Sequence, residues 1–285
     1  MFKDCYHLCT SALKKAVLCR DKEDYIFLWN SIAIGASALD IKIFCLCLMS
    51  NHFHILLRAK PETVNLFMKR LKTRLGRFMM RKYSTSIARE IEYELFPVLD
   101  RKSFCQEVAY ILRNPYKAKL AGPFAYPWNS ALAYFQSLNR SGRLVSDLSV
   151  RERMSLLGTK QPLPGKMLVS PEGIILPESF IDVSFVEQMF GNSSFLFFDM
   201  LRKWNLEDIV DGAHGETVAE AYSDDEVLRG IRDICRDDFG GISPERMDQK
   251  MRIRLARRIH ARFGASRSQL LRLLPVDEYL LERIL

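Results

Sequence analysis

The chain has 285 residues, of which 48% are hydrophobic and 27% are charged, and its formal net charge is +8. This length and composition predict a soluble globular protein with one well-packed domain and a second, smaller one. A membrane-spanning protein is excluded, because no stretch approaches the roughly 20 apolar residues that a crossing helix needs. Asp4 and His7 stand where a signal peptide would have its apolar core, so we expect a cytoplasmic protein without a membrane partner.

The first elements alternate between strand and helix patterns. Residues 4–12 are β-prone, and a helix follows from Asp21, which can cap it, with Asp24 in the reciprocal position of a capping box. Two apolar runs at 41–49 and 52–58 are separated only by a short polar break. This arrangement predicts a β-hairpin.

Helices follow the predicted hairpin. A long amphipathic helix starts at Pro61 and runs to about Tyr83, and a less regular stretch then continues to about residue 102. Residues 103–114 form a second helix, whose continuation Pro115 limits. Strand, helix, hairpin, helix and helix predict an α+β fold with an antiparallel sheet and helices packed on it.

The second half of the chain changes from loop-like to helical composition. Residues 120–175 contain clusters of Gly, Pro, Ser and Asn that are typical of loops. Helical patterns dominate from about residue 183 to the end. We therefore expect a domain at 1–135, a loop-rich connector at 136–182 and a helical C-terminal domain at 183–285.

The seven cysteines contain no CxxC pair, so a zinc ribbon or a thioredoxin-type site is not expected. Cys45 and Cys47 lie on one face of a predicted apolar strand. We expect the cysteines to be reduced, buried small residues.

Positive charge is concentrated in two segments. Residues 60–83 contain eight Lys or Arg and one acid, and residues 246–272 contain nine and one acid. Two basic segments on an otherwise balanced chain indicate a polyanionic partner. The alternative is that both are simply solvated helix faces.

His52 and His54 bracket Phe53 in the second arm of the predicted hairpin. Side chains alternate along a strand, so both imidazoles project from one face. Together they could bind a divalent cation with a third ligand from elsewhere. The alternative is a pair of polar histidines on a solvated sheet face.

Tyr110 and Asn114 lie four residues apart and thus on one face of the predicted helix 103–114. A tyrosine hydroxyl has an ordinary pKa near 10 and needs help from a cation or a base to act as a nucleophile. The amide oxygen of Asn114 is a suitable ligand for a hard metal. Alternatively, Tyr110 is a core aromatic residue and Asn114 ends the helix before Pro115.

Several strings occur in a fixed order along residues 1–135: Tyr6-His7, DKEDY (21–25), LMSNHFHILL (48–57), MKRLKTRLGRFMMRKY (68–83), YILRNPYKAKLAG (110–122) and Tyr126-x-Trp128-x-Ser130. In this order and spacing they resemble the IS200-like single-tyrosine transposases, especially the REP-associated tyrosine transposases. These belong to the HUH endonucleases, named for their His–hydrophobic–His motif. The family usually has Pro where Ser50 stands here, and Arg101 is displaced from the family's aromatic-Gln-x-Arg string.

The resemblance implies a ferredoxin-like HUH nuclease domain in which His52, His54 and Asn114 bind Mg²⁺ or Mn²⁺. It also implies that Tyr110 attacks a phosphodiester in single-stranded DNA, usually beside a hairpin. The products would be a 5′-phosphotyrosine and a free 3′-OH. The partner would be single-stranded or hairpin DNA, and the sequence leaves open whether the protein acts as a monomer or as a homodimer.

Two groups of basic residues are candidates for DNA binding. In helix 61–83 they are Lys69, Arg70, Lys72, Arg74 and Arg77. Near the C-terminus, a turn at Gly264 and a helix from Ser266 to Leu274 resemble a helix-turn-helix whose recognition helix carries Arg267 and Arg272. The alternative for this region is a small helical bundle with a basic outer face.

Three functions are compatible with these patterns. The first is an active enzyme that nicks and transfers DNA strands. The second is a catalytically inactive, domesticated relative that binds hairpin DNA or regulates transcription. The third is an RNA-binding protein that uses the same basic surface.

Overall fold

A computed structural model of the chain describes the following residues: 2–11, 17–118, 120–136, 142–202, 224–263, 265, 267–277 and 281. The turn predicted at Gly264 and the start of its following helix at Ser266 lie outside the described residues. Among the described helices, none is both long enough and apolar enough to cross a membrane.

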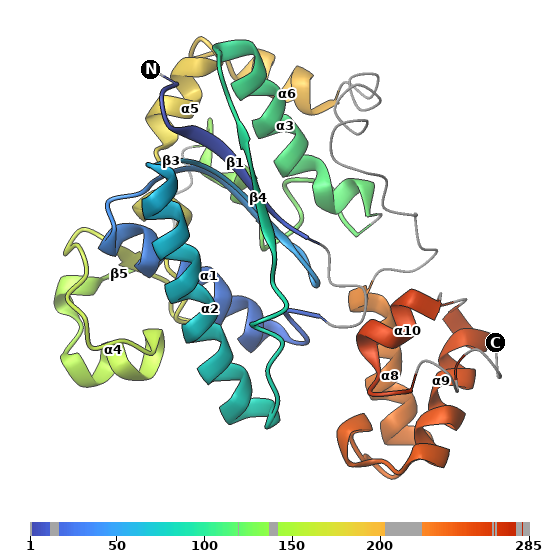
Figure 1. Cartoon of the computed structure of the whole chain (residues 1–285). Helices are drawn as coiled ribbons and strands as arrows, with labels where there is room; N and C mark the ends of the chain where they lie inside the picture. Colours follow the sequence, from blue (N-terminus) through green and yellow to red (C-terminus); the bar gives the residue numbers. More distant parts are fainter. Residues whose placement is uncertain are drawn as a thin grey trace.

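A four-stranded antiparallel sheet forms the centre of the N-terminal part, which confirms the predicted α+β fold (Figure 1). The strand order is β2-β3-β1-β4. With the helices α1 and α2 between strands, the order along the chain is the βαββαβ arrangement of ferredoxin-like folds. The bounds are β1 (Cys5–Thr10), α1 (Lys22–Ala38), β2 (Lys42–Leu48), β3 (Phe53–Arg58), α2 (Pro61–Tyr83) and β4 (Tyr93–Pro97).

Helices cover both faces of this sheet (Figure 1). α1 and α2 pack against each other on one face, and the other face is covered by a group of later helices. These are α3 (Arg101–Lys117), α5 (Val183–Met189) and α6 (Ser194–Arg202). One hydrophobic core runs through the sheet and all five helices, so α5 and α6 pack with the N-terminal elements although they follow the predicted connector.

Strand register decides which side chains face α3. Cys9 pairs with His54 and His7 pairs with Leu56 between β1 and β3. Because side chains alternate along each strand, His7, Cys9 and His54 project from the same face. The ring of His7 lies against the ring of Tyr110, which identifies this as the α3 face.

The start of α1 differs in one detail from the predicted capping box. The side chain of Asp21 caps the helix by accepting from the backbone N–H of Asp24, at 3.1 Å. The carboxylate of Asp24 accepts from the backbone N–H of Arg20 rather than from that of Asp21, at 2.7 Å. Asp24 is buried and also binds Lys82 and Tyr83, so it joins the start of α1 to the end of α2.

Two elements between α2 and residue 120 differ from the prediction. The stretch predicted as irregular contains the edge strand β4, which pairs with β1 alone among the described strands. α3 continues through Pro115 to Lys117, although proline was expected to limit it. Proline removes one backbone N–H, and the side-chain amide of Asn114 instead donates toward the carbonyl of Ile111, at 3.5 Å. Near a helix end this single lost bond is tolerated.

The free edge of β2 is covered by the segment with the Tyr126-x-Trp128-x-Ser130 pattern. The backbone N–H of Leu48 donates to the carbonyl of Trp128, at 2.8 Å, and the hydroxyl of Ser130 accepts from the N–H of Leu46, at 3.0 Å. An uncovered sheet edge invites pairing with other chains. This pattern therefore protects the edge strand next to β3.

The region predicted as loops at 120–175 contains short regular elements. These are the short 3₁₀ helices η1 (Ser130–Ala133) and η2 (Val145–Asp147), the strands β5 (Arg143–Leu144) and β6 (Leu168–Val169), and the helix α4 (Val150–Leu157). A further 3₁₀ helix, η3 (Pro177–Ser179), follows them. Ser149 and Glu152 form a capping box that starts α4. The indole N–H of Trp29 donates to the carbonyl of Ile175, at 2.8 Å, so the region is fastened to α1.

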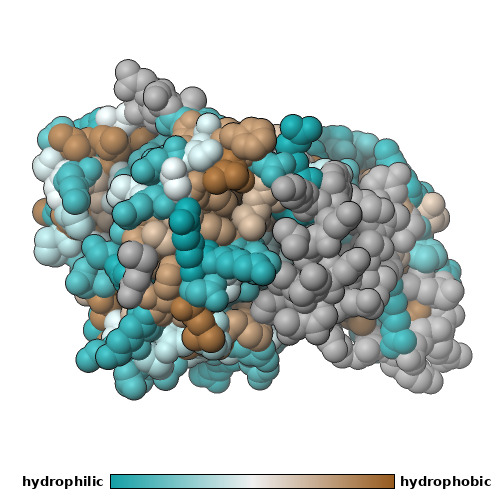
Figure 2. All heavy atoms as spheres, turned by 90° about the horizontal axis from the view of Figure 1, so that it is seen from above, coloured by the Kyte–Doolittle hydropathy of each residue, from teal (hydrophilic) through white to brown (hydrophobic). Residues whose placement is uncertain are grey.

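The predicted helical C-terminal region is confirmed (Figure 1). It contains α8 (Asp224–Asp238), the 3₁₀ helix η4 (Pro244–Arg246), α9 (Gln249–Phe263) and α10 (Arg267–Leu273). The helices α8, α9 and α10 share a second hydrophobic cluster. On the face of the whole molecule seen in Figure 2, the hydrophobic groups of the described residues are interrupted by hydrophilic side chains, as is usual for a protein surface.

Candidate active site

Three aromatic rings converge on the α3 face of the sheet. The ring centroids of His52 and His54 are 4.9 Å apart and the rings are almost perpendicular, at 85°. The ring of Tyr110 lies 5.8 Å from that of His54. The β2–β3 turn carries His52, β3 carries His54 and α3 carries Tyr110, so the fold brings the three together although His52 and Tyr110 are 58 residues apart in the sequence.

His54 is held by a buried chain of polar contacts that runs through His7 to Glu107. Nε2 of His7 and Nδ1 of His54 are 3.0 Å apart, and Nδ1 of His7 lies 2.8 Å from a carboxylate oxygen of Glu107. When Nδ1 of His7, which faces the Glu107 carboxylate, carries the proton, Nε2 of His7 can accept from Nδ1–H of His54. In this tautomer Nε2 of His54 would be the nitrogen that binds a metal.

The neighbours of His52 fix this ring in a similar way. Nδ1 of His52 lies 2.8 Å from the amide oxygen of Asn51, so its Nδ1–H donates to that oxygen. Burial lowers the pKa of His52 to about 4; Asp224 opposes this shift and Arg272 adds to it. The imidazole is therefore neutral near pH 7, which is the form that coordinates a metal.

A second donor group overlaps this site. His7, Cys9 and His54 each place a donor atom within 4.8 Å of the others, an arrangement compatible with metal binding. It shares His54 with the predicted ligand set and adds two residues to which the sequence analysis gave no role. Burial, followed by the charges of Glu94 and Glu107, raises the pKa of the Cys9 thiol to about 12. A neutral thiol is a poor ligand for the hard cations Mg²⁺ and Mn²⁺.

Asn114 lies one helical turn beyond Tyr110 on α3. Its amide nitrogen donates to the carbonyl oxygens of Tyr110, at 3.1 Å, and of Ile111. These bonds use the nitrogen, so they do not involve the amide oxygen that was predicted as a metal ligand.

Positive charge adjoins the tyrosine. The ammonium of Lys117 lies 4.6 Å from the centroid of the Tyr110 ring. A cation at this position attracts the electrons of the ring and would favour negative charge on the phenol oxygen. Lys117 was quoted only as part of a family string, and the sequence analysis gave it no role.

The C-terminal helices contact the turn that carries His52. The carboxylate of Asp224, at the start of α8, accepts from the hydroxyl of Ser50 at 3.0 Å, and from Gln269 and Arg272 of α10 at 3.1 Å and 2.6 Å. Asp224 and Arg272 have side chains only 6% and 10% exposed. Arg272 is thus committed to an internal ion pair, and we do not retain it as a DNA contact.

Two candidates on α2 also have structural partners. The guanidinium of Arg74 donates to the hydroxyl of Ser31, at 2.8 Å, and to the carbonyl of Leu157, at 2.6 Å. The ammonium of Lys72 donates to the carbonyl of Ile91, at 2.7 Å. Lys69, Arg70 and Arg77 are exposed on the same helix and stay DNA-binding candidates.

All seven cysteines are free thiols, and six of them are buried. Cys9 is the partly exposed one. Their burial agrees with the expectation of small, packed residues.

The fold and the site together define an α+β domain with a histidine pair on its sheet. Residues 2–96 match the family described as Transposase IS200 like, a segment that extends from β1 into β4. The matched segment is 95 of the 285 residues, so it shows a similarity of this part of the chain to IS200-like transposases. Tyr110 and Asn114 follow the matched segment. The comparisons with curated proteins and with solved structures found no match.

The sequence analysis gave no role to His7 and Glu107, because their contacts depend on strand register and on helix packing. His7 and Glu107 act on His54 through strand pairing between β1 and β3 and through the packing of α3. The one available signal was the spacing of Glu107, three residues before Tyr110 and therefore on a neighbouring helix face.

We expect His7→Gln to weaken Mn²⁺ binding by about 10- to 100-fold, the usual effect of removing a residue that orients a histidine ligand. The measurement is calorimetric titration of Mn²⁺ without DNA, with circular dichroism to establish that the variant is folded. His260→Gln is the matched control, because His260 lies on α9 and contacts the carbonyl of Ala265. Equal Mn²⁺ affinities for His7→Gln and wild type would remove His7 from this role.

Proposed function

We propose that this protein is a metal-dependent enzyme that nicks and rejoins single-stranded DNA, with Tyr110 as the nucleophile. The observation that supports this most is the approach of the Tyr110 ring to His54, which itself adjoins His52, in a chain whose residues 2–96 match a transposase family. A tyrosine beside two imidazoles is an arrangement suited to phosphodiester chemistry.

The residues fit a divalent cation. Nδ1 of both histidines is occupied by a neighbouring group, so each ring would present Nε2, and the amide oxygen of Asn114 would be the third ligand. Imidazole and amide donors suit Mg²⁺ or Mn²⁺ better than a set containing the Cys9 thiol would. A bound cation would polarise the scissile phosphate and stabilise charge that develops in the transition state.

The protein's own groups would carry out the covalent step. The phenol oxygen of Tyr110 forms a bond to phosphorus, the bond from phosphorus to the 3′ oxygen breaks, and the phenol loses its proton. The 3′ oxygen leaves and takes up a proton, which yields a 5′-phosphotyrosine and a free 3′-OH. The 3′-OH can reverse the reaction, so rejoining needs no external source of energy. Lys117 beside the ring would stabilise the phenolate.

The substrate that we propose is single-stranded DNA next to a hairpin. Within the C-terminal region, α8 to α10 would form a separate DNA-binding domain, for which Arg267 on α10 stays a candidate contact. Because α5 and α6 pack in the first core, this proposed domain would begin at α8 rather than at residue 183.

The test is an adduct assay with hairpin oligonucleotides whose single-stranded flanks are randomised. With Mn²⁺ we expect 3′-labelled DNA to migrate with the protein on a denaturing gel, since the tyrosine retains the 5′ phosphate of that fragment. The 5′-labelled fragment should be free and extendable by a polymerase, because it ends in a 3′-OH. EDTA should abolish both signals.

The same assay separates the proposal from its alternative. Hairpin binding without any adduct, with Mn²⁺ present, would support an inactive relative that only binds DNA and would contradict the enzyme.

A further inference from the structure

His54 belongs to two groups of donor atoms, one on each side of its ring. On the Nδ1 side lie His7 and Cys9, and the donor atoms of the three residues are all within 4.8 Å of one another. We call His7, Cys9 and His54 the Cys9 cluster. His7 and His54 are 0% and 3% exposed, whereas Cys9 is partly exposed. A cation would therefore enter the cluster from the side of the thiol.

The spacing of these donors suits one tetrahedral ion. Nε2 of His7 and Nδ1 of His54 are 3.0 Å apart. Two imidazole nitrogens on one Zn²⁺ lie about 3.3 Å apart, because each Zn–N bond is about 2.0 Å long and the angle is tetrahedral. The two rings thus need to separate by only about 0.3 Å. Cys9 pairs directly with His54 in the sheet, so its side chain projects beside that ring.

His7 already has the support that metal-bound histidines usually have. Its Nδ1 lies 2.8 Å from a carboxylate oxygen of Glu107. A carboxylate that accepts from one ring nitrogen leaves the other nitrogen as the metal ligand and fixes the orientation of the ring. Here that other nitrogen is Nε2, which faces the Cys9 cluster.

Two carboxylates give the surroundings of the cluster a negative charge. Glu94 pairs with Cys9 between β1 and β4, so both side chains project from the same face. The charges of Glu94 and Glu107 both act on the thiol and disfavour a thiolate on its own. The same charges attract a dication, and a thiol that binds a dication loses its proton. Glu94 is thus placed to be the fourth ligand of a tetrahedral site.

The donor set selects the kind of ion. A thiolate with two imidazoles suits Zn²⁺, whereas Mg²⁺ and Mn²⁺ prefer oxygen donors. The sequence has no CxxC pair and therefore no zinc ribbon, but the Cys9 cluster needs only one cysteine.

His54 cannot serve both groups of donors at once. At the candidate active site its Nε2 would bind the cation and its Nδ1 would carry the proton. In the Cys9 cluster Nδ1 would bind the cation and the proton would have to be on Nε2. A neutral imidazole has one N–H and one acceptor nitrogen. The two cations therefore compete for one ring.

We propose that His7, Cys9 and His54 form an inhibitory site for a thiophilic divalent cation, represented by Zn²⁺. When Zn²⁺ binds, the S–H bond of Cys9 breaks, an S–Zn bond forms and the proton goes to solvent. The ring proton of His54 moves from Nδ1 to Nε2, so the catalytic cation loses a ligand. The inhibition rests on the proposed function, whereas the site itself does not.

The first test uses Co²⁺ as a spectroscopic substitute for Zn²⁺, with the full chain and without DNA. We expect a near-ultraviolet charge-transfer band from thiolate to cobalt, which one equivalent of Zn²⁺ removes. Cys9→Ala should lose this band. It should also bind Zn²⁺ at least about 100-fold more weakly, because a direct ligand contributes more than the 10- to 100-fold typical of a supporting residue.

Cys47→Ala is the matched control. Cys47 also pairs with His54, from the strand on the other side, but its thiol contacts the sulfur of Met49, at 3.9 Å. This variant should keep the band and the Zn²⁺ affinity, with circular dichroism to establish that both variants are folded. A wild-type protein without the band, or a band that persists in Cys9→Ala, would overturn the site.

The second test measures the competition between the two cations. Zn²⁺ is titrated into protein loaded with Mn²⁺, and electron paramagnetic resonance follows the Mn²⁺ that is released. Half-release should need at least about 10-fold more Zn²⁺ in Cys9→Ala than in wild type. Equal values would mean that Zn²⁺ simply replaces Mn²⁺ at His52 and His54, and would overturn the inhibition. If the wild type binds no Mn²⁺, the proposed function fails, but the Co²⁺ spectra still test the site.

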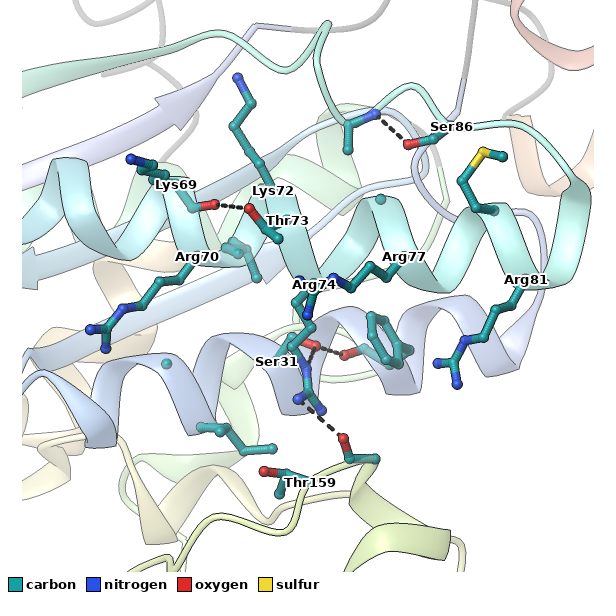
Figure 3. A pocket seen from close by; sticks show the side chains of 18 of the residues that line it. Ser31, Lys69, Arg70, Lys72, Thr73, Arg74, Arg77, Arg81, Ser86 and Thr159 are labelled. Carbon is teal, nitrogen blue, oxygen red and sulfur yellow. Dashed lines mark hydrogen bonds between the residues drawn. The ribbon is translucent and has the colours of Figure 1, made fainter.

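DNA binding shows whether the inhibition is selective. The DNA-binding candidates Lys69, Arg70 and Arg77 lie on α2 in a pocket beside α1, on the other face of the sheet (Figure 3). Zn²⁺ in the Cys9 cluster should therefore abolish the covalent adduct and leave fluorescence anisotropy with labelled DNA unchanged. A parallel loss of DNA binding and adduct would overturn selective inhibition at His54.

Discussion

Tyr110→Phe is expected to abolish the covalent protein–DNA adduct while leaving the fold and DNA binding unchanged. The substitution removes only the hydroxyl, and the phenyl ring can keep its contacts with His7 and His54. Without the phenol oxygen no bond to phosphorus can form, so both cleavage products should fall to background. The measurement is the adduct assay with 3′-labelled hairpin DNA and Mn²⁺.

Tyr116→Phe is the matched control for this prediction. Tyr116 lies on α3 as well, but six residues further on, and its side chain is exposed. Six residues correspond to about 240° around a helix, if each residue turns it by about 100°. We expect this variant to form the adduct at the wild-type level. An adduct that persists in Tyr110→Phe and disappears in Tyr116→Phe would move the nucleophile to Tyr116.

Asp224→Ala is expected to have the largest effect on stability. The change leaves the guanidinium of Arg272 buried without its carboxylate and removes an acceptor from Ser50 and Gln269. Breaking a buried ion pair by removing one partner typically costs about 3 to 5 kcal/mol. The C-terminal helices should unfold at lower urea concentration, which far-ultraviolet circular dichroism would follow.

Two further variants make this prediction specific. Asp237→Ala removes a carboxylate from an exposed pair with Arg236 and should leave the urea transition in place. Asp224→Leu/Arg272→Met removes both charges and should recover part of the stability lost in Asp224→Ala. If the double variant is no more stable than Asp224→Ala, the loss does not come from the unpaired guanidinium.

The hairpin and its histidines could be predicted from local pattern alone. Two apolar runs with a short polar break define β2 and β3, and the alternation of side chains puts His52 and His54 on one side. The same reasoning missed β4, because an edge strand that pairs with one neighbour has little need for a regular apolar face. It also ended α3 too early, because the local rule for proline does not include the substitute bond from Asn114.

The supporting residues of the site depend on tertiary contacts that sequence spacing does not express. His7 reaches His54 because β1 pairs with β3 in one particular register, and a shift by one residue would turn it to the opposite face. Arg272 looked like a DNA contact because basic helices often are, yet its partner Asp224 is 48 residues away. Composition predicts how much charge a helix carries. Tertiary packing determines whether each charged side chain binds a protein group or stays available to a ligand.

The hydrogen bond between Ser50 and Asp224 means that two separately packed cores share a boundary only two residues from His52. By thermodynamic reciprocity, a ligand that stabilises one arrangement of this boundary binds that arrangement more tightly, and the two effects have the same free energy. Cation occupancy at the histidines and the docking of α8 and α10 would then rise and fall together. The family usually has proline at the position of Ser50. Proline has no hydroxyl to donate, so this hydrogen bond could not couple the two cores in such relatives.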